Sequence, residues 1–178
     1  MAVVKPVIFQ VVGFQNSGKT TFLKNLINML SKESIKVVTI KHHGHGGKPE
    51  VPEAKDSSQH IEAGAVVSLV EGEGRLILQA EMETFGLVEK IQLISFFKPD
   101  IILIEGHKFE DYPKAVIIRN EEDVTLLNKL KNVQVIYFWD EELMVGIEFE
   151  KIPSFHKDDP NGIDWLMGSI KDFQLKNV

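Results

Sequence analysis

The chain has 178 residues, of which 43% are hydrophobic and 26% are charged, and this size suits one domain with a full core. The net charge of −6 argues against a general nucleic-acid surface, and no apolar run is long enough to span a membrane. The chain has no cysteine, which excludes disulfides, cysteine-type zinc sites and thiol catalysis. The first residues lack the layout of a signal peptide, so we expect a cytoplasmic protein with one domain over residues 1–178.

The first predicted elements are a strand, a glycine-rich loop and a helix. Residues 7–12 form an apolar run typical of a buried strand, and residues 20–30 carry apolar side chains at helical spacing. Between them lies Gly13-Phe14-Gln15-Asn16-Ser17-Gly18-Lys19-Thr20, which matches the P-loop signature G-x-x-x-x-G-K-[ST]. The strand before the motif and the helix after it are the context that it requires. The pattern therefore predicts a binding site for a nucleoside triphosphate.

Each residue type in this loop has a chemical reason. Gly13 and Gly18 let the backbone curl so that consecutive N–H groups face one anion, and the helix N-terminus adds a partial positive charge there. Lys19 can reach the β- and γ-phosphates, and Thr20 can bind Mg²⁺. Thr21 is a further hydrogen-bond donor to the phosphates. The predicted nucleotide-binding residues of the loop are Gly13, Gln15, Asn16, Ser17, Gly18, Lys19, Thr20 and Thr21.

A second strand and a long loop follow the first helix. Residues 35–40 form the strand, which completes a βαβ unit and predicts a parallel sheet. Residues 41–55 are rich in glycine, proline and histidine, and a loop this long in a compact domain is usually functional or disordered. It leaves the carboxyl end of a parallel strand, where open α/β sheets bind their ligands.

Candidate ligand-binding side chains gather in and after this loop. Imidazole suits zinc, but the histidines lack the HExxH arrangement. Hydrogen bonding to phosphate or substrate by Lys41, His42 or His60 is therefore favoured over a transition-metal site. Asp56 begins a short predicted helix over residues 56–63. Its carboxylate either caps that helix or helps to hold Mg²⁺, and both interpretations stay open.

The middle of the chain predicts a β-hairpin. Two strand-like runs, residues 65–70 and 75–80, are joined by Glu71-Gly72-Glu73-Gly74. An isolated hairpin is only marginally stable, so it must extend the sheet or pair with another chain. The two alternatives are a monomer with the hairpin on its sheet edge and a symmetric dimer through paired edges. The hazard of an unpaired edge favours the dimer.

An acidic residue at the end of a later strand completes the predicted nucleotide site. A helix over residues 87–97 is followed by Asp100 and the aliphatic strand 101–104, which ends at Glu105. An acid at the carboxyl end of a parallel strand meets the phosphates, whereas one at the amino end does not. Glu105 rather than Asp100 is therefore the predicted Mg²⁺-side carboxylate, and the alternative is that Glu105 only caps a loop.

The remaining elements complete an α/β fold. They are a strand over 115–119, a helix over 121–130, a strand over 133–139 closed by Asp140, and a final helix over about 162–173. Trp139 and Trp165 lie on apolar runs, so core packing is predicted for both. The whole pattern predicts a three-layer P-loop NTPase with a mostly parallel sheet and an added β-hairpin.

Several short motifs together resemble one family. They are Gly13 to Thr21, Lys41-His42 with His45, Asp56-Ser57 with His60, Ala63-Gly64-Ala65, and Glu105-Gly106 with Lys108. Their order and spacing resemble molybdopterin-guanine dinucleotide biosynthesis protein B, MobB, over nearly the whole chain.

This resemblance implies a GTP-binding protein with weak GTPase activity that forms a homodimer through the added hairpin. It implies a role in molybdenum cofactor biosynthesis, in which the protein assists a guanylyltransferase that attaches GMP to molybdopterin. Lys19 and Glu105 carry over as catalytic residues, and Thr20 and Glu105 as the Mg²⁺ ligands. Asp140 matches an acid that accepts hydrogen bonds from guanine. Possible substrate or switch residues are Lys41, His42, His45, Asp56, His60 and Lys108.

The chain also departs from the family pattern. Ser58, Gln59 and Ile61 replace the Trp and two Arg of many members, and His107 stands where an aromatic residue is common. The N-K-x-D guanine motif is absent, because Asn128-Lys129-Leu130-Lys131 lacks the acid and lies inside a predicted helix. The preference for guanine therefore rests on the resemblance.

The sequence shows no strong water-positioning residue, so we expect slow hydrolysis by the isolated protein. Three alternatives stay open: a small-molecule kinase that uses residues 42–55 as its substrate site, a non-hydrolysing nucleotide-dependent adaptor, and a metallochaperone GTPase that uses the loop histidines.

Overall fold

The structure is a computed structural model that describes residues 5–44, 48–49, 55–144 and 151–176. The chain falls into two compact units, residues 1–42 with 90–178 and residues 43–89. None of the helices in the described ranges is long and apolar enough to cross a membrane. The single domain predicted over residues 1–178 stays a prediction.

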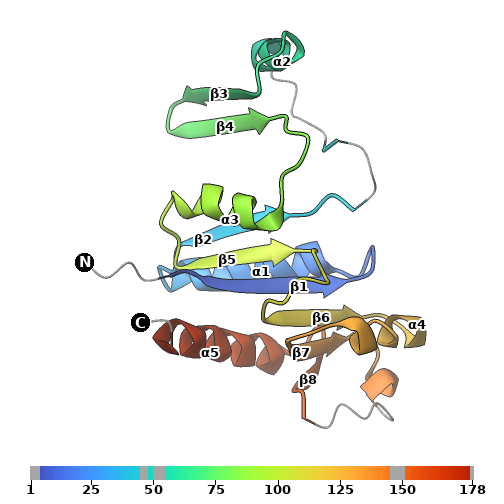
Figure 1. Ribbon diagram of the computed structural model, residues 1–178. Helices are drawn as coiled ribbons and strands as arrows, with labels where there is room; N and C mark the ends of the chain where they lie inside the picture. Colours follow the sequence, from blue (N-terminus) through green and yellow to red (C-terminus); the bar gives the residue numbers. More distant parts are fainter. Residues whose placement is uncertain (1–4, 45–47, 50–54, 145–150, 177–178) are drawn as a thin grey trace. The chain divides into compact units, whose positions relative to one another are not determined.

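A six-stranded parallel sheet forms the centre of the first unit. Its strands run in the order β2-β5-β1-β6-β7-β8, and every neighbouring pair is parallel (Figure 1). The strands are β1 (Val7–Gly13), β2 (Val37–Lys41), β5 (Ile101–Glu105), β6 (Lys114–Ile118), β7 (Val133–Phe138) and β8 (Ser154–His156). Parallel strands end at one edge of a sheet, so the residues that follow β5, β6 and β7 gather around the loop that follows β1.

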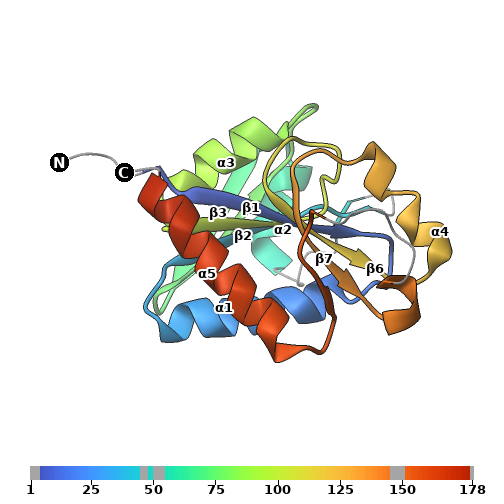
Figure 2. The same cartoon turned by 90° about the horizontal axis from the view of Figure 1, so that it is seen from below.

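Apolar residues are buried on both faces of this sheet. The helical segments are α1 (Lys19–Lys32), α3 (Leu87–Ser95), α4 (Glu121–Val124), α5 (Pro160–Lys176) and the 3₁₀ turns η1 (Leu127–Lys129) and η2 (Glu141–Met144). Helices α1 and α5 pack on one face of the sheet (Figure 2). The core on this face includes Tyr137. The neighbouring Ile136 points to the other face and packs with Leu126 and Leu127. Burial on both faces is typical of a parallel sheet and explains why its strands are almost continuously apolar.

The second unit contains a short helix and the predicted hairpin. Helix α2 (Lys55–Glu62) precedes β3 (Val67–Gly72) and β4 (Arg75–Ala80), which pair antiparallel in a two-stranded sheet of their own. The connection is the dipeptide Glu73-Gly74, with φ of 49° and 79°. Two consecutive positive φ angles give the turn that matches the natural twist of a hairpin. The mostly parallel sheet with helices and an added hairpin is therefore confirmed.

The segment after β6 differs from its prediction. The predicted helix over 121–130 is broken, because α4 ends at Val124 and a 3₁₀ turn follows. The amide N–H groups of Asp123, Thr125 and Leu126 all bond to carbonyls three residues earlier. The Thr125 hydroxyl also donates to the Glu122 carbonyl at 2.8 Å, a local bond that competes with a regular helix.

The carboxyl-terminal segment also differs from its prediction. The short edge strand β8 was not predicted, since three residues carry too little pattern to be recognised. Helix α5 begins at Pro160 rather than near residue 162. Proline suits the first position of a helix, because its fixed φ is already helical and it has no N–H to satisfy.

Candidate functional site

The P-loop crosses from the end of β1 to the start of α1. Gly13 has a φ of 155°, and a Cβ at this position would lie 2.7 Å from the Ile117 carbonyl oxygen and 2.7 Å from the Ser17 hydroxyl oxygen. Gly18 precedes the first helical residue with a φ of 85°. Both conformations favour glycine, which has no Cβ to clash. The structure thus explains both glycines of the motif by local sterics, and the loop can approach an anion closely.

Lys19 folds back over the loop that precedes it. Its ammonium donates to the Phe14 carbonyl at 2.5 Å and to the Ser17 hydroxyl at 3.4 Å. Burial lowers the pKa of Lys19; the Glu105 carboxylate opposes this shift, whereas nearby cationic side chains add to it. Those cations are Arg119, Lys108 and Lys41. A protein with a net charge of −6 therefore concentrates positive charge around this loop, which suits a highly charged phosphate ligand.

Thr20 and Glu105 meet at the carboxyl edge of the sheet. The Thr20 hydroxyl donates to both carboxylate oxygens of Glu105, at 3.0 and 3.1 Å. Mg²⁺ usually takes one or two protein oxygens and completes its octahedral shell with phosphate and water oxygens. This hydroxyl and carboxylate fit that requirement. Asp100 lies at the opposite end of β5, where its carboxylate accepts the Lys36 backbone N–H at 2.7 Å.

Lys41 adds a cation to the same pair. Its ammonium lies 3.4 Å from the Thr20 hydroxyl oxygen and 3.5 Å from a Glu105 carboxylate oxygen. Lys41 is the last residue of β2 and is the register partner of Glu105 on β5. The structure therefore brings Lys41, a predicted phosphate or substrate ligand, next to Thr20 and Glu105, the predicted Mg²⁺ ligands.

The loop after β5 lies beside the P-loop as well. The buried Gln10 side chain donates to the carbonyls of His107 at 2.8 Å and Gly106 at 3.2 Å, and so holds this loop to β1. The His42 and His107 rings lie 4.6 Å apart between centroids, and burial followed by the His42 charge lowers the pKa of His107. The Lys108 ammonium lies 4.7 Å above the Phe14 ring. His42 and Lys108 are thus placed near the P-loop.

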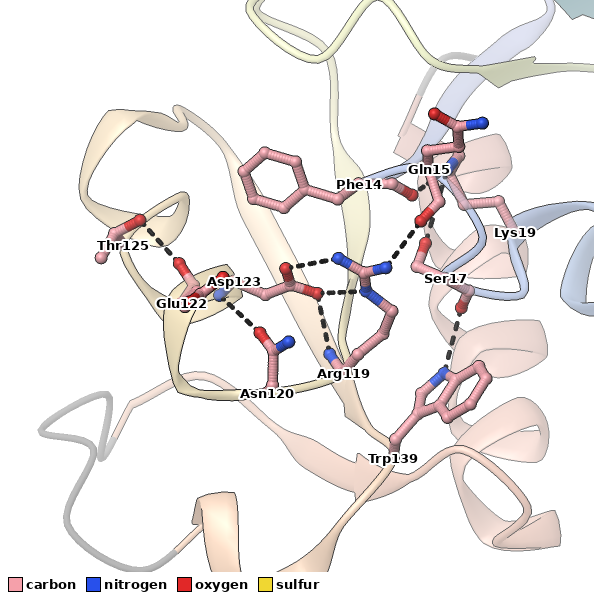
Figure 3. A network of polar contacts seen from close by, with 10 residues as sticks. All are labelled: Phe14, Gln15, Ser17, Lys19, Arg119, Asn120, Glu122, Asp123, Thr125 and Trp139. Carbon is pink, nitrogen blue, oxygen red and sulfur yellow. Dashed lines mark hydrogen bonds and ion pairs between the residues drawn. The ribbon is translucent and has the colours of Figure 1, made fainter.

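Arg119 braces the P-loop from the end of β6. Its guanidinium forms two parallel bonds to Asp123, Nε to Oδ2 at 2.8 Å and Nη2 to Oδ1 at 2.9 Å (Figure 3). Its third nitrogen, Nη1, donates to the Gln15 carbonyl at 2.8 Å. Burial would raise the pKa of Asp123, but the bonds and charge of Arg119 outweigh it and hold that pKa below its usual value. The Arg119 guanidinium is therefore fixed by a buried carboxylate while it contacts the P-loop.

Trp139 contacts the P-loop from the end of β7. Its indole Nε1 donates to the Ser17 carbonyl at 3.1 Å (Figure 3). The side chain is 42% exposed, so the predicted core packing of Trp139 is wrong, whereas Trp165 is partly buried against the core. Neither Arg119 nor Trp139 was predicted as a site residue. Each is the last residue of a predicted parallel strand. Residues at the carboxyl ends of parallel strands meet the ligand, and this argument, which predicted Glu105, applies to both of them as well.

The other predicted site residues are less closely grouped. Asp140 follows β7 and accepts the Glu142 backbone N–H at 3.0 Å, which caps the turn η2. Thr21 is an exposed residue of the first turn of α1. Asp56 and His60 lie in α2 of the second unit, and His45 lies outside the described residues. Within the described part of the chain, no group of three or more His, Cys, Asp or Glu side chains is arranged to hold a metal ion.

The chain is similar to proteins of one family in both sequence and fold. Residues 8–139 match the family described as molybdopterin guanine dinucleotide synthesis protein B. A probable molybdopterin-guanine dinucleotide biosynthesis adapter protein of Bacillus subtilis is 41% identical over 173 residues, covering 96% of this chain and 98% of that protein.

Two solved structures have a similar fold. The crystal structure of Bacillus subtilis MobB superposes with a TM-score of 0.77 at 42% identity, covering 91% of this chain and 96% of that one. A MobB homologue from Bacillus stearothermophilus gives a TM-score of 0.74 at 31% identity, with coverage of 93% and 98%. The family match over residues 8–139 includes the P-loop and the hairpin.

Proposed function

Because the chain belongs to the molybdopterin guanine dinucleotide synthesis protein B family, we propose that it is a GTP-binding adapter in the biosynthesis of molybdopterin guanine dinucleotide. The membership confirms the resemblance that its short motifs indicate. Its partner in this proposal is the guanylyltransferase that attaches GMP to molybdopterin. The observation that carries the nucleotide part of the proposal is the P-loop itself, in which Lys19 and Thr20 face Glu105 across the end of the sheet.

The triphosphate would be held mainly by the loop backbone and by nearby cations. The N–H groups at the start of α1 and the partial charge of the helix N-terminus favour an anion. Lys19 bonds to the loop at Phe14 and Ser17, which supports a role for its ammonium in binding the phosphates. Asp140 is the proposed acceptor for the guanine N1 and N2 donors, since a carboxylate complements that edge of the base.

Thr20 and Glu105 are the proposed Mg²⁺ ligands. Their oxygens already lie within 3.1 Å of each other, which lets one cation contact both. A bound Mg²⁺ would neutralise charge on the phosphate oxygens.

We propose that hydrolysis by the isolated protein is slow. Lys19 is engaged by the loop, and Arg119 is engaged by Asp123 and Gln15. Of the acids in the site, Glu105 is engaged by Thr20. These contacts engage each of the three side chains with protein groups rather than leaving it free to orient a water molecule. The relatives are named adapter proteins, which favours a protein that assists another enzyme over a fast hydrolase.

A homodimer through the hairpin is part of this proposal. Val67, Leu69, Leu76 and Leu78 lie on one face of the hairpin, and each is 41% to 52% exposed. The hairpin forms a two-stranded sheet of its own, which is marginal without further packing. A second copy of this chain would cover the apolar face and the open edges symmetrically.

The experiment that tests the nucleotide proposal is a calorimetric titration of GTP and of ATP with Mg²⁺. We expect binding of GTP in preference to ATP, and loss of GTP binding in Lys19→Ala. The matched control is Lys24→Ala, an exposed lysine of the same helix. Normal GTP binding by Lys19→Ala, or a preference for ATP, would contradict the proposal.

A second candidate is an adapter that binds GTP without turning it over, which the relatives' names also favour. It predicts tight binding with no phosphate release, even when the partner guanylyltransferase is present. A coupled phosphate-release assay with and without that partner distinguishes the two forms of the proposal.

A further inference from the structure

Trp139 is fixed at its backbone and turned toward the P-loop. Its backbone N–H donates to the Ile118 carbonyl at 3.0 Å, which anchors it to β6. Its carbonyl oxygen lies 3.0 Å from His156 Nε2, which anchors it to β8. The indole N–H is then directed at the Ser17 carbonyl, at 3.1 Å (Figure 3). The backbone of Trp139 is therefore held by both neighbouring strands, and the indole bond to Ser17 connects it to the P-loop.

The indole nevertheless remains open to solvent. Trp139 is 42% exposed, and its six-membered ring lies 3.7 Å from the position that a Cβ on Gly18 would occupy. The Lys157 ammonium lies 5.4 Å from the centre of the ring. An exposed aromatic face between a phosphate-binding loop and a cation suits a planar, anionic ligand such as a nucleotide.

Trp139 also connects two parts of the proposed site. It precedes Asp140, the proposed acceptor for the base, and it bonds to Ser17 in the phosphate-binding loop. Arg119 holds the P-loop independently, through the Gln15 carbonyl. The shape of the P-loop therefore does not depend on Trp139 alone, whereas the attachment of the Asp140 segment to the P-loop includes the indole bond.

We infer that Trp139 is a positioning residue for base recognition: its indole bond to Ser17 fixes the Asp140 segment against the P-loop. The base and the triphosphate of one nucleotide are then bound in a fixed position relative to each other. This inference rests on the proposed nucleotide binding and adds a residue that determines the specificity of that site.

The test compares Trp139→Phe with wild type for binding of GTP, ATP and inorganic tripolyphosphate, each with Mg²⁺. Phenylalanine keeps an aromatic ring and removes the N–H donor. A lost hydrogen bond of ordinary strength predicts a roughly three- to tenfold weaker affinity for GTP. We expect the preference for GTP over ATP to shrink by a similar factor and the affinity for tripolyphosphate to stay within about twofold, because Arg119 still holds the loop.

The matched control is Trp165→Phe, which makes the same change at the other tryptophan, a partly buried residue packed against the core. We expect it to bind all three ligands as wild type does. It also leaves Trp139 as the sole tryptophan, so its fluorescence reports on this residue even if Trp139→Phe does not fold. GTP is expected to change the emission clearly more than tripolyphosphate does.

The possible outcomes separate this inference from the proposed function. If wild type binds no GTP, both are overturned. If wild type binds GTP and Trp139→Phe binds it equally well, only the inference fails. It also fails if Trp139→Phe weakens GTP and tripolyphosphate by the same factor, or if both ligands change the Trp139 emission equally, because the indole would then act on the phosphate loop alone.

Discussion

The ammonium of Lys41 lies 3.5 Å from the Glu105 carboxylate, and these two residues are register partners on the neighbouring strands β2 and β5. The same ammonium lies 3.4 Å from the Thr20 hydroxyl oxygen. A side-chain cation therefore stands next to both groups that we propose as Mg²⁺ ligands. Of Lys41, Glu105 and Thr20, only Glu105 is an acid, so the negative charge that would attract Mg²⁺ comes from its carboxylate.

Glu105→Gln is expected to raise the Mg²⁺ concentration needed for half-maximal GTP binding by about tenfold or more, because the neutral amide is a much poorer ligand for a hard cation. The control is Asp100→Asn, which makes the equivalent change at the opposite end of β5 and keeps an acceptor for the Lys36 N–H. Calorimetric GTP titrations over a Mg²⁺ series measure the effect. An unchanged Mg²⁺ requirement in Glu105→Gln would show that Glu105 is not a Mg²⁺ ligand.

Leu78→Lys is expected to convert the proposed dimer to a monomer, because a charge would enter the apolar face that Leu78 shares with Leu69. GTP binding should persist, since the P-loop belongs to the other unit. Leu175→Lys is the control, because Leu175 is an exposed leucine of α5. Light scattering during size-exclusion chromatography gives the molecular mass. A monomeric wild type, or a dimeric Leu78→Lys, would count against pairing through this face.

The sequence predicted most of the fold because its signals were local. Alternating strand and helix patterns predict a parallel sheet, and the glycine turn at residues 73 and 74 predicts the hairpin. The broken helix after α4 was missed because its turns are decided by bonds such as Thr125 to Glu122, which compete with a helix that propensity alone favours.

The site was predicted only in part for a related reason. The P-loop and Glu105 follow from a motif and from the edge at which parallel strands end. Arg119 and Trp139 belong to the same edge, but their contacts are long-range: Arg119 bonds to Gln15, and Trp139 bonds to Ser17, across 104 and 122 residues of sequence. No local pattern separates an exposed tryptophan at a strand end from one buried in the core.

Tyr137→Phe is expected to alter the response of stability to alkaline pH. The Tyr137 hydroxyl is buried and donates to the Gly162 carbonyl at 2.8 Å, and burial raises the pKa of Tyr137 well above its usual value. Above a pH of about 10 this tyrosine ionises in the unfolded chain but not in the folded one, so it stabilises the fold less as pH rises. Phenylalanine removes that contribution to the slope and costs about 1 kcal/mol at neutral pH through the lost hydrogen bond.

Urea unfolding at a series of pH values from 7 to 11 measures this effect. Tyr112→Phe is the control, because it changes the other tyrosine of the chain. We expect it to retain the alkaline loss of stability. If Tyr137→Phe and wild type lose stability in parallel above pH 10, Tyr137 is not the group responsible.

Arg119→Met is expected to destabilise the fold by about 2–4 kcal/mol, because it leaves the carboxylate of Asp123 without its cation in a buried position. Asp123 is only 2% exposed, and the two parallel bonds from the guanidinium are its main compensation. Adding Asp123→Asn to Arg119→Met removes the uncompensated charge, so the double variant should regain part of the lost stability. The Asp123 amide N–H is capped by Asn120 in either case.

The free energies of unfolding in urea of the wild type, both single variants and the double variant form a complete cycle, in which a favourable coupling is expected between contacting residues. The low pKa of Asp123 adds a pH signature. The contribution of Asp123 to the free energy of unfolding is fully present above its unfolded pKa of about 3.8, and it is lost as pH falls through its lower folded pKa. The wild type should therefore lose stability on acidification more steeply than Arg119→Met. Additive single effects with identical acid slopes would show that Arg119 holds the P-loop without depending on Asp123.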